Sequence, residues 1–278
     1  MVSKLEEYMF DLNGYLLLEN ALSGNEVQEI NSALDAIPPL EPGEWYGYVQ
    51  REKFEASRGI AWQQIYEAGE PFERLIDHPS WYEHALRFVG GEGTFDYNHG
   101  PLFIDENFAS FRSPGQAIGL HAGGYDASKK QLFRVQNGMF MCGQINILIA
   151  LNDIGPGDGA TMVIPGSHKS NFPHPQFGEH IISEGASVEG TAGAVEVHMK
   201  TGDAILFVDA IAHGSARRSN PGQRRFIVYR YGPTWNFFRW GYRPSPELLA
   251  RLTSRRRQMV WPWQEWERVP NRKPGFSG

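Results

Sequence analysis

Two histidines lie in glycine-rich stretches that suit a metal site. His121 stands in Gly119-Leu-His-Ala-Gly-Gly-Tyr-Asp126, and His213 opens His213-Gly-Ser215. Histidine is the commonest metal ligand among the side chains. We therefore predict that His121 and His213 together hold one metal ion.

An arginine follows the second histidine at a distance that suits a short hairpin. Arg224 comes after the turn residues Asn220-Pro-Gly222, and an antiparallel hairpin at this turn would bring His213 and Arg224 together. A guanidinium beside a metal suits a dicarboxylate that chelates the metal with one end and pairs with the arginine at the other. Ser215 would point to the same side of its strand as His213 and could donate to that carboxylate.

Short strands are predicted around these residues. From Gly90 onward glycine is frequent and the apolar runs have strand length, so strands are expected over residues 94–98, 102–104, 142–152, 161–164, 194–198, 204–208 and 226–231. Short strands at fairly regular spacing indicate a sandwich or barrel. Gln144 and Asn146 alternate with a row of isoleucines, and two amides inside a barrel need partners. We expect both to face the cavity and to hold the co-substrate or the substrate.

Helices are expected on either side of this β region. Residues 5–36 predict a short strand and then a helix capped by Ser23 with Glu26. Residues 70–90 form a second helical region, and Ser245 with Pro246 begins a third over residues 244–252. The fold class is α+β, mainly β. One domain, 1–278, is expected, with a helical part of about 1–90, a β core of about 91–235 and a helical extension of about 236–278.

Composition narrows the class of partner. The chain has 278 residues, a net charge of −6 and a pI near 5.9, so no nucleic-acid partner is expected. A single cysteine excludes a disulfide within the chain. No apolar stretch reaches the length of a membrane span, and no signal peptide is apparent. These features favour a cytoplasmic protein with a small-molecule substrate and no membrane partner.

The order of these motifs resembles the phytanoyl-CoA dioxygenase family of Fe(II)/2-oxoglutarate-dependent oxygenases. The resemblance extends from about residue 11 to about residue 231, and its most specific part is Asp158-Gly-Ala-Thr-Met-Val-Ile-Pro-Gly-Ser-His168. It implies a double-stranded β-helix, a cupin-like jelly roll, with O2 and 2-oxoglutarate as co-substrates. It also implies that His121 and His213 bind Fe(II), and that Arg224 and Ser215 contact the distal carboxylate of 2-oxoglutarate. His168 belongs to a turn that is usually structural in this family.

The chain departs from the family pattern at the third iron ligand. The family has His-x-Asp, and two histidines with one carboxylate are typical of this iron chemistry. Position 123 would lie on the same face of a strand as His121, but it holds Gly123, which has no side chain to donate.

Three explanations remain open for this glycine. In the first, chloride fills the hollow beside iron, as the resemblance to related halogenases implies, and the product is halogenated. In the second, water or another carboxylate such as Asp126 completes the site, and the protein is a hydroxylase. In the third, turnover has been lost, and the fold is a non-catalytic cupin-like binding protein. Halogenation of an aliphatic C–H bond is the specific hypothesis that we take forward.

Further residues are candidates for the substrate side of the site. Arg112, on the segment that leads to His121, would pair with an anionic substrate. Trp62, Tyr97 and His99 stand in stretches that would line the open end of the barrel.

Overall fold

The computed structural model describes residues 1–53, 56–90, 95, 98–180, 185–238 and 243–262. Its framework is a large sheet with strand order β1-β11-β8-β13-β5-β4-β3-β2. These strands are β1 Tyr15–Leu18, β2 Trp45–Tyr46, β3 Val49–Arg51, β4 Ile60–Gln63, β5 Phe103–Arg112, β8 Ile145–Ala150, β11 Ala204–Val208 and β13 Arg224–Gly232. All the recorded strand pairs are antiparallel. Strands from the first ninety residues therefore extend the sheet on both sides.

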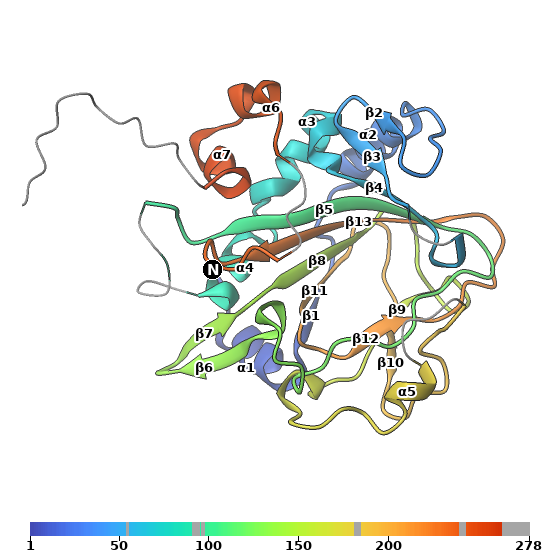
Figure 1. The fold of residues 1–278 in the computed structure, drawn as a ribbon, viewed down its shortest axis with the longest axis vertical. Helices are drawn as coiled ribbons and strands as arrows, with labels where there is room; N and C mark the ends of the chain where they lie inside the picture. The colour runs from blue at the N-terminus through green and yellow to red at the C-terminus, as the bar shows by residue number, and fades with distance from the viewer. Residues whose placement is uncertain (54–55, 91–94, 96–97, 181–184, 239–242, 263–278) are drawn as a thin grey trace, which may run out of the picture.

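A smaller sheet lies opposite the large one. Its strands are β10 Val195–Val197, β9 Thr161–Val163 and β12 His213–Ser215, in that order. Figure 1 shows this sheet below β5, β13 and β8, with the chain passing between the two layers. A separate ribbon consists of β6 Phe133–Gln136 and β7 Met139–Cys142. The two facing sheets confirm the predicted jelly-roll core.

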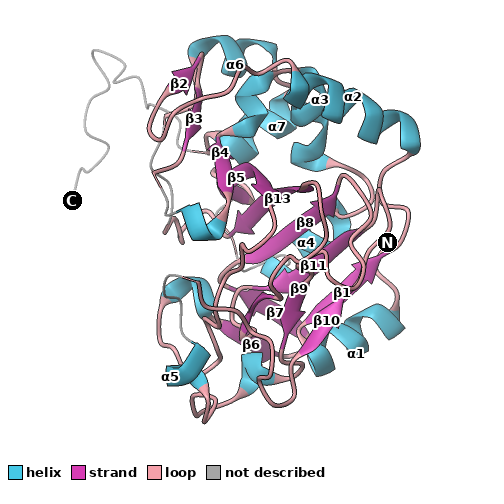
Figure 2. Ribbon diagram, turned by 90° about the vertical axis from the view of Figure 1, so that its right-hand side faces the viewer, coloured by secondary structure: helices cyan, strands magenta, loops and turns pink. Residues whose placement is uncertain are grey.

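Helices pack outside the sheets. They are α1 Lys4–Asn13, α2 Gly24–Asp35, α3 Glu70–Glu73, α4 Tyr82–Val89, α5 Phe177–His180, α6 Pro246–Arg251 and α7 Ser254–Val260. In Figures 1 and 2, α2, α3, α6 and α7 lie on the side of the large sheet away from the small one. The apolar face of α2, with Val27, Ile30 and Leu34, is buried in the main core. The helices thus cover the outer face and leave the inner face for a site.

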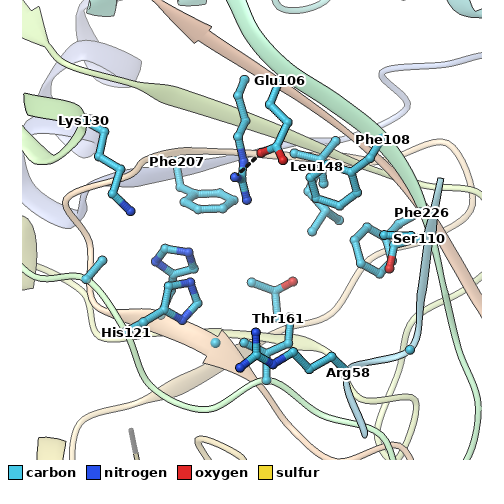
Figure 3. A pocket seen from close by; sticks show the side chains of 18 of the residues that line it. Arg58, Glu106, Phe108, Ser110, His121, Lys130, Leu148, Thr161, Phe207 and Phe226 are labelled. Atoms are coloured by element: carbon cyan, nitrogen blue, oxygen red, sulfur yellow. Dashed lines mark hydrogen bonds and ion pairs between the residues drawn. The ribbon is translucent and has the colours of Figure 1, made fainter. Parts of the chain in front are cut away.

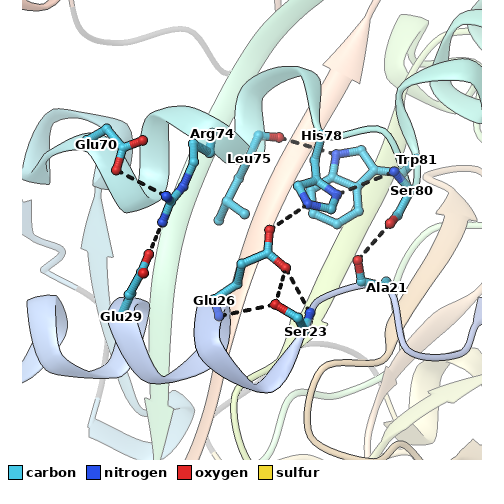
Figure 4. A network of polar contacts seen from close by, with 10 residues as sticks. All are labelled: Ala21, Ser23, Glu26, Glu29, Glu70, Arg74, Leu75, His78, Ser80 and Trp81. Carbon is cyan, nitrogen blue, oxygen red and sulfur yellow. Dashed lines mark hydrogen bonds and ion pairs between the residues drawn. The ribbon is translucent and has the colours of Figure 1, made fainter.

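Sequence capping signals set where two helices begin. Ser23 caps α2 by accepting from the Glu26 backbone, as the sequence predicts, and the Glu26 side chain also reaches His78 (Figure 4). Ser3 and Glu6 form the same capping box at α1. Helix α1 was not predicted, although Ser3-Lys-Leu-Glu6 fits a capping box as well as the motif at Ser23 does.

Several strand predictions need correction. β5 has ten residues, where the sequence analysis predicted three, because its polar residues alternate toward an interior cavity and interrupt the apolar run. The predicted strand 142–152 is divided into β7 and β8. The predicted strand 94–98 lies mostly outside the described residues. None of the helices within the described ranges is long and apolar enough to cross a membrane.

Candidate active site

His121 and His213 lie side by side on the small-sheet wall. Their backbones exchange two hydrogen bonds of 2.9 Å each, which extends the small sheet by one bridge at His121. The two imidazole rings are 4.1 Å apart between centroids and are inclined by 53°. The tertiary fold therefore joins two histidines that are far apart in sequence.

Backbone carbonyls fix the orientation of both rings. His121 Nδ1 is 3.0 Å from the Gly119 oxygen, and His213 Nδ1 is 2.6 Å from the Ile211 oxygen. Since a carbonyl only accepts, each Nδ1 carries the proton and each Nε2 keeps a free lone pair. Burial lowers the pKa of His213 to about 4, and burial followed by the nearby His213 lowers the pKa of His121. Both imidazoles are therefore neutral at pH 7, the form that binds a metal.

A cavity of about 560 Å³ lies between the two sheets, with both histidines in its wall. Alternate residues of β5 and β13 form its floor, because side chains on a strand alternate between two faces. The facing pairs along this floor are Arg112 with Arg224, Ser110 with Phe226, Phe108 with Val228 and Glu106 with Arg230. The floor therefore has Arg112 at one end, with Arg224 buried beside it outside the cavity wall, an apolar middle and a Glu106–Arg230 ion pair at the other end. Figure 3 shows Glu106, Phe108, Ser110 and Phe226 along this floor.

The arginine end of the cavity lies close to the histidines. Arg224 is completely buried, and it donates to the Gly159 oxygen and, at 3.0 Å, to Thr161 Oγ1. Thr161 pairs with Ser215 across β9 and β12, two residues along the strand from His213. This places Thr161 roughly 7 Å from the level of His213. The spacing suits a ligand that reaches the histidines with one end and the arginines with the other.

The strand pairing that positions Arg224 differs from the prediction. The expected hairpin between His213 and Arg224 is wrong, since β12 pairs with β9 in the small sheet and β13 pairs with β5 and β8 in the large one. The chain crosses from one sheet to the other between these strands. His213 lines the cavity from the small sheet, and Arg224 is buried in the large sheet beside Arg112.

The backbone around Gly123 also differs from a strand. Ala122 has a φ of +64° and Gly123 a φ of +141°, so the alternation that would place residue 123 on the face of His121 does not apply. A Cβ at Gly123 would lie 2.7 Å from Tyr125 Cε1 and 2.8 Å from Tyr125 Cδ1. A side chain at position 123 would therefore meet the Tyr125 ring, so the space in the direction of its Cβ is not empty.

Asp126 is engaged within its own loop. Its Oδ1 accepts from Ser128 N at 2.9 Å, and the Gln131 amide, in the orientation that satisfies its neighbours, donates to its Oδ2 at 2.8 Å. Across the described ranges, no group of three or more His, Cys, Asp and Glu side chains could hold a metal ion. The donor set of two neutral imidazoles fits a divalent metal that takes its remaining ligands from outside the protein.

The other predicted co-substrate residues lie near the cavity without lining it. Ser215 is buried, and its Oγ accepts from Ile118 N at 2.9 Å. Asn146 donates to Asp209 Oδ1 at 3.1 Å, and the Gln144 oxygen accepts from Asp209 N at 2.9 Å. These two residues therefore hold Asp209, whose carboxylate lies 3.5 Å from Lys130 Nζ.

Among the predicted substrate residues that the structure describes, Arg112 alone lines the cavity. The Trp62 ring packs against Phe111 at 4.6 Å, His99 is absent from the cavity wall, and Tyr97 lies outside the described residues. Thr161, Lys130 and the Glu106–Arg230 pair also line the cavity and were not predicted from the sequence. The alternation Glu106-x-Phe108-x-Ser110-x-Arg112 is the signal that could have indicated the cavity floor.

His168 has a structural environment, as the resemblance implied. Its Nε2 is 3.0 Å from the Asp11 oxygen, and its ring lies 4.5 Å from that of Phe133. It joins the turn after β9 to α1 and stays out of the cavity wall.

Known proteins share this architecture. The structure of HygX from Streptomyces hygroscopicus with nickel and 2-oxoglutarate bound has a TM-score of 0.67 at 23% identity, over 89% of this chain and 94% of that one. The epimerase SnoN from nogalamycin biosynthesis has a TM-score of 0.56 at 17% identity, over 82% and 81% of the two chains.

Sequence relatives are dioxygenases. An ectoine dioxygenase from Nocardia farcinica is 22% identical over 237 residues, which are 79% of this chain and 75% of that protein. Dioxygenase cdmD from Talaromyces verruculosus is 26% identical over 117 residues, 42% of this chain and only 35% of cdmD. The sequence pattern of phytanoyl-CoA dioxygenase (PhyH) matches residues 10–226. The chain therefore belongs to the phytanoyl-CoA dioxygenase family of Fe(II)/2-oxoglutarate-dependent oxygenases.

Proposed function

We propose that this protein is an Fe(II)/2-oxoglutarate-dependent hydroxylase that acts on an aliphatic C–H bond of a small molecule. The observation that carries the proposal is a pair of neutral histidines with Thr161 roughly 7 Å along the small sheet from the level of His213, where the buried Arg224 donates to Thr161. When bound, iron supplies the oxidising chemistry, using O2 and the decarboxylation of 2-oxoglutarate to succinate. The protein supplies the ligands and the shape of the cavity.

Each wall has a separate task in this proposal. The Nε2 atoms of His121 and His213 hold the metal, and the arginine end receives the distal carboxylate of 2-oxoglutarate. The apolar middle of the floor and the Phe207 ring, which lies 4.9 Å from the ring of His213, exclude water from the metal and hold the substrate. Lys130 and the Glu106–Arg230 pair give polar contacts to a substrate. HygX has been solved with hygromycin B, which supports a small molecule as the substrate class.

Tyr125 supports hydroxylation over halogenation. A halide would need the space that a side chain at position 123 leaves, and the Tyr125 ring lies 2.7 Å from the Cβ position there. Halogenation stays the second candidate, because Gly123 has no carboxylate and no group of three or more His, Cys, Asp and Glu side chains in the described part of the chain could hold a metal ion. In the hydroxylase, water or an external carboxylate completes the metal site.

Anaerobic reconstitution tests the oxygenase. Fe(II) and 2-oxoglutarate are added to the purified protein, and the visible charge-transfer absorption and the 2-oxoglutarate affinity are measured. After O2 is admitted, succinate is quantified. We expect His121→Ala to abolish the absorption band, while the matched control His198→Ala, whose side chain is 46% exposed beside Glu196, keeps it. A wild-type protein with neither band nor succinate would instead favour the cupin-like binding protein.

Halide titration separates the two oxidative outcomes. Chloride and then bromide are added to the anaerobic ternary complex of protein, Fe(II) and 2-oxoglutarate. For a hydroxylase we expect no halide-dependent change in the band and, with a turned-over substrate, products heavier by one oxygen. A halide-dependent shift together with a halogenated product would establish the second candidate.

A further inference from the structure

Two arginines lie side by side where the cavity floor ends, Arg112 in the floor and Arg224 beside it. Arg112 and Arg224 face each other in the β5–β13 register, and their side chains are 4% and 0% exposed. Both guanidinium groups lie over the ring of Phe226, at 5.2 Å for Arg112 and 4.4 Å for Arg224. Two like charges are thus held in adjacent positions away from bulk water.

Neither guanidinium is paired with a carboxylate in the described part of the chain. The neighbouring acid, Asp158, is already bound by Arg218 at 2.9 Å and Asn220 at 3.0 Å. Arg112 Nε and Nη1 are buried with no hydrogen-bond partner among the described residues, and the same is true of Arg224 Nε. A buried charge without a partner is among the costliest features of a protein interior, so such groups indicate a site for a bound anion.

Electrostatics agrees with this geometry. Burial lowers the pKa of Arg112 to about 10, and burial followed by the charge on Arg112 lowers the pKa of Arg224. Both groups still carry their charge at neutral pH. An anion between them would neutralise their repulsion and supply the missing acceptors.

The two arginines are not equivalent. Arg224 already donates to the Gly159 oxygen and to Thr161, and it is absent from the cavity wall. Arg112 lines the cavity directly. Gly59 makes room for it, because a Cβ at Gly59 would lie 3.0 Å from Arg112 Cγ and 2.5 Å from the Phe111 oxygen. Arg112 is thus the guanidinium with free donors and access to a ligand.

We propose that Arg112 contacts the distal carboxylate of the 2-oxo-dicarboxylate co-substrate, with Arg224 and Thr161 holding the other side of that carboxylate. This assigns Arg112 to the co-substrate, whereas the sequence alone assigned it to the substrate. The inference rests on the proposed function for the identity of the ligand. It makes Arg112 a residue that selects dicarboxylates over monocarboxylates.

A matched pair of ligands tests the contact. 2-Oxoglutarate and 2-oxopentanoate have the same chain length, but the second has a methyl group where the first has its distal carboxylate. Their affinities are measured by calorimetry on protein loaded with Mn(II), for the wild type, Arg112→Met and the exposed control Arg217→Met. We expect Arg112→Met to lower the affinity for 2-oxoglutarate about 10- to 100-fold, because charged hydrogen bonds to its distal carboxylate are lost. The affinity for 2-oxopentanoate should be unchanged.

Two other results would overturn the inference. If Arg112→Met loses the same affinity for both ligands, Arg112 only maintains the fold of the cavity. An unchanged affinity for 2-oxoglutarate would show that Arg112 serves another ligand. The Arg217→Met control should bind both ligands as the wild type does.

Thermal unfolding without metal gives an independent readout. Because Arg112→Met removes an uncompensated buried charge, the ligand-free variant should be at least as stable as the wild type, so loss of folding cannot explain weaker binding. Glutarate should raise the Tm of the wild type and not that of the variant. If 2-oxoglutarate fails to bind with metal while the glutarate effect depends on Arg112, the proposed function fails and the anion site stands. If no ligand effect depends on Arg112, the inference itself fails.

Discussion

The glycine beside the first histidine gives the sharpest test of the local geometry. We predict that Gly123→Ala destabilises the protein by about 2–4 kcal/mol. A positive φ in a sparsely populated region costs about 1–3 kcal/mol for a residue with a Cβ, and the φ of Gly123 is +141°. The Cβ of an alanine there would also lie 2.7 Å from Tyr125, which adds an overpacking cost of about 1 kcal/mol. This value is at the low end of overpacking costs, because the half-buried Tyr125 ring can shift.

A second glycine separates the two contributions. Gly69 has a φ of +123°, but a Cβ there would meet only Pro71 Cδ at 4.0 Å. Gly69→Ala should therefore show the backbone cost alone. Tyr125→Ala, introduced into the Gly123→Ala protein, should restore about 1 kcal/mol, which a double-mutant cycle would isolate.

Urea unfolding of the four variants and the wild type measures these differences. If Gly123→Ala costs no more than Gly69→Ala, or if Tyr125→Ala restores nothing, the Tyr125 ring does not fill the space beside residue 123. The argument against a halide there would then be lost. An aspartate shares the Cβ of alanine, so we expect that Gly123→Asp would carry the same cost before any gain from metal binding.

Two further predictions concern stability and reactivity. The hydrogen bond from Ser23 lowers the pKa of Glu26 from 4.5 to about 2, and Glu26 also contacts His78. This stabilisation is present above pH 4.5 and is lost as the pH falls towards 2. Urea unfolding at about pH 6 and about pH 3 measures the loss, and with solvent screening we expect the free energy of unfolding to fall by about 1 kcal/mol on this account. The contribution should be absent in Glu26→Gln. An identical pH dependence in the variant would contradict it. Burial raises the pKa of Cys142, which is 1% exposed, so thiol reagents should modify it no faster than the chain unfolds, and rapid labelling of the native protein would refute this.

Local sequence patterns were sufficient for the fold class and for several elements. The capping box at Ser23, the Pro246 at the first position of α6 and the apolar strand 204–208 are all present as predicted. These features depend on neighbours within a few residues, so the sequence specifies them without the rest of the molecule. The same holds for the missed helix α1, whose capping signal was present.

The site could be predicted only in part. Residue types and their order marked His121, His213 and Arg224 as a group. The fold brings both histidines into one cavity wall and buries Arg224 behind Thr161 of that wall. The sheet in which each of them lies could not be predicted, because strand pairing across two sheets depends on contacts between distant segments. The hairpin expected between His213 and Arg224 is wrong for this reason: each strand finds better partners elsewhere, β12 with β9 and β13 with β5 and β8.

The sequence by itself determined the family, the jelly-roll core and the absence of a carboxylate at position 123. Only the tertiary structure decided what surrounds that position and which charges meet. Backbone dihedrals at Ala122 and Gly123 direct the missing side chain toward Tyr125, and the β5–β13 register places Arg112 opposite Arg224. Alternation along one strand tells which face a residue occupies. A positive φ interrupts that rule, and the register of a distant strand decides which residue lies opposite.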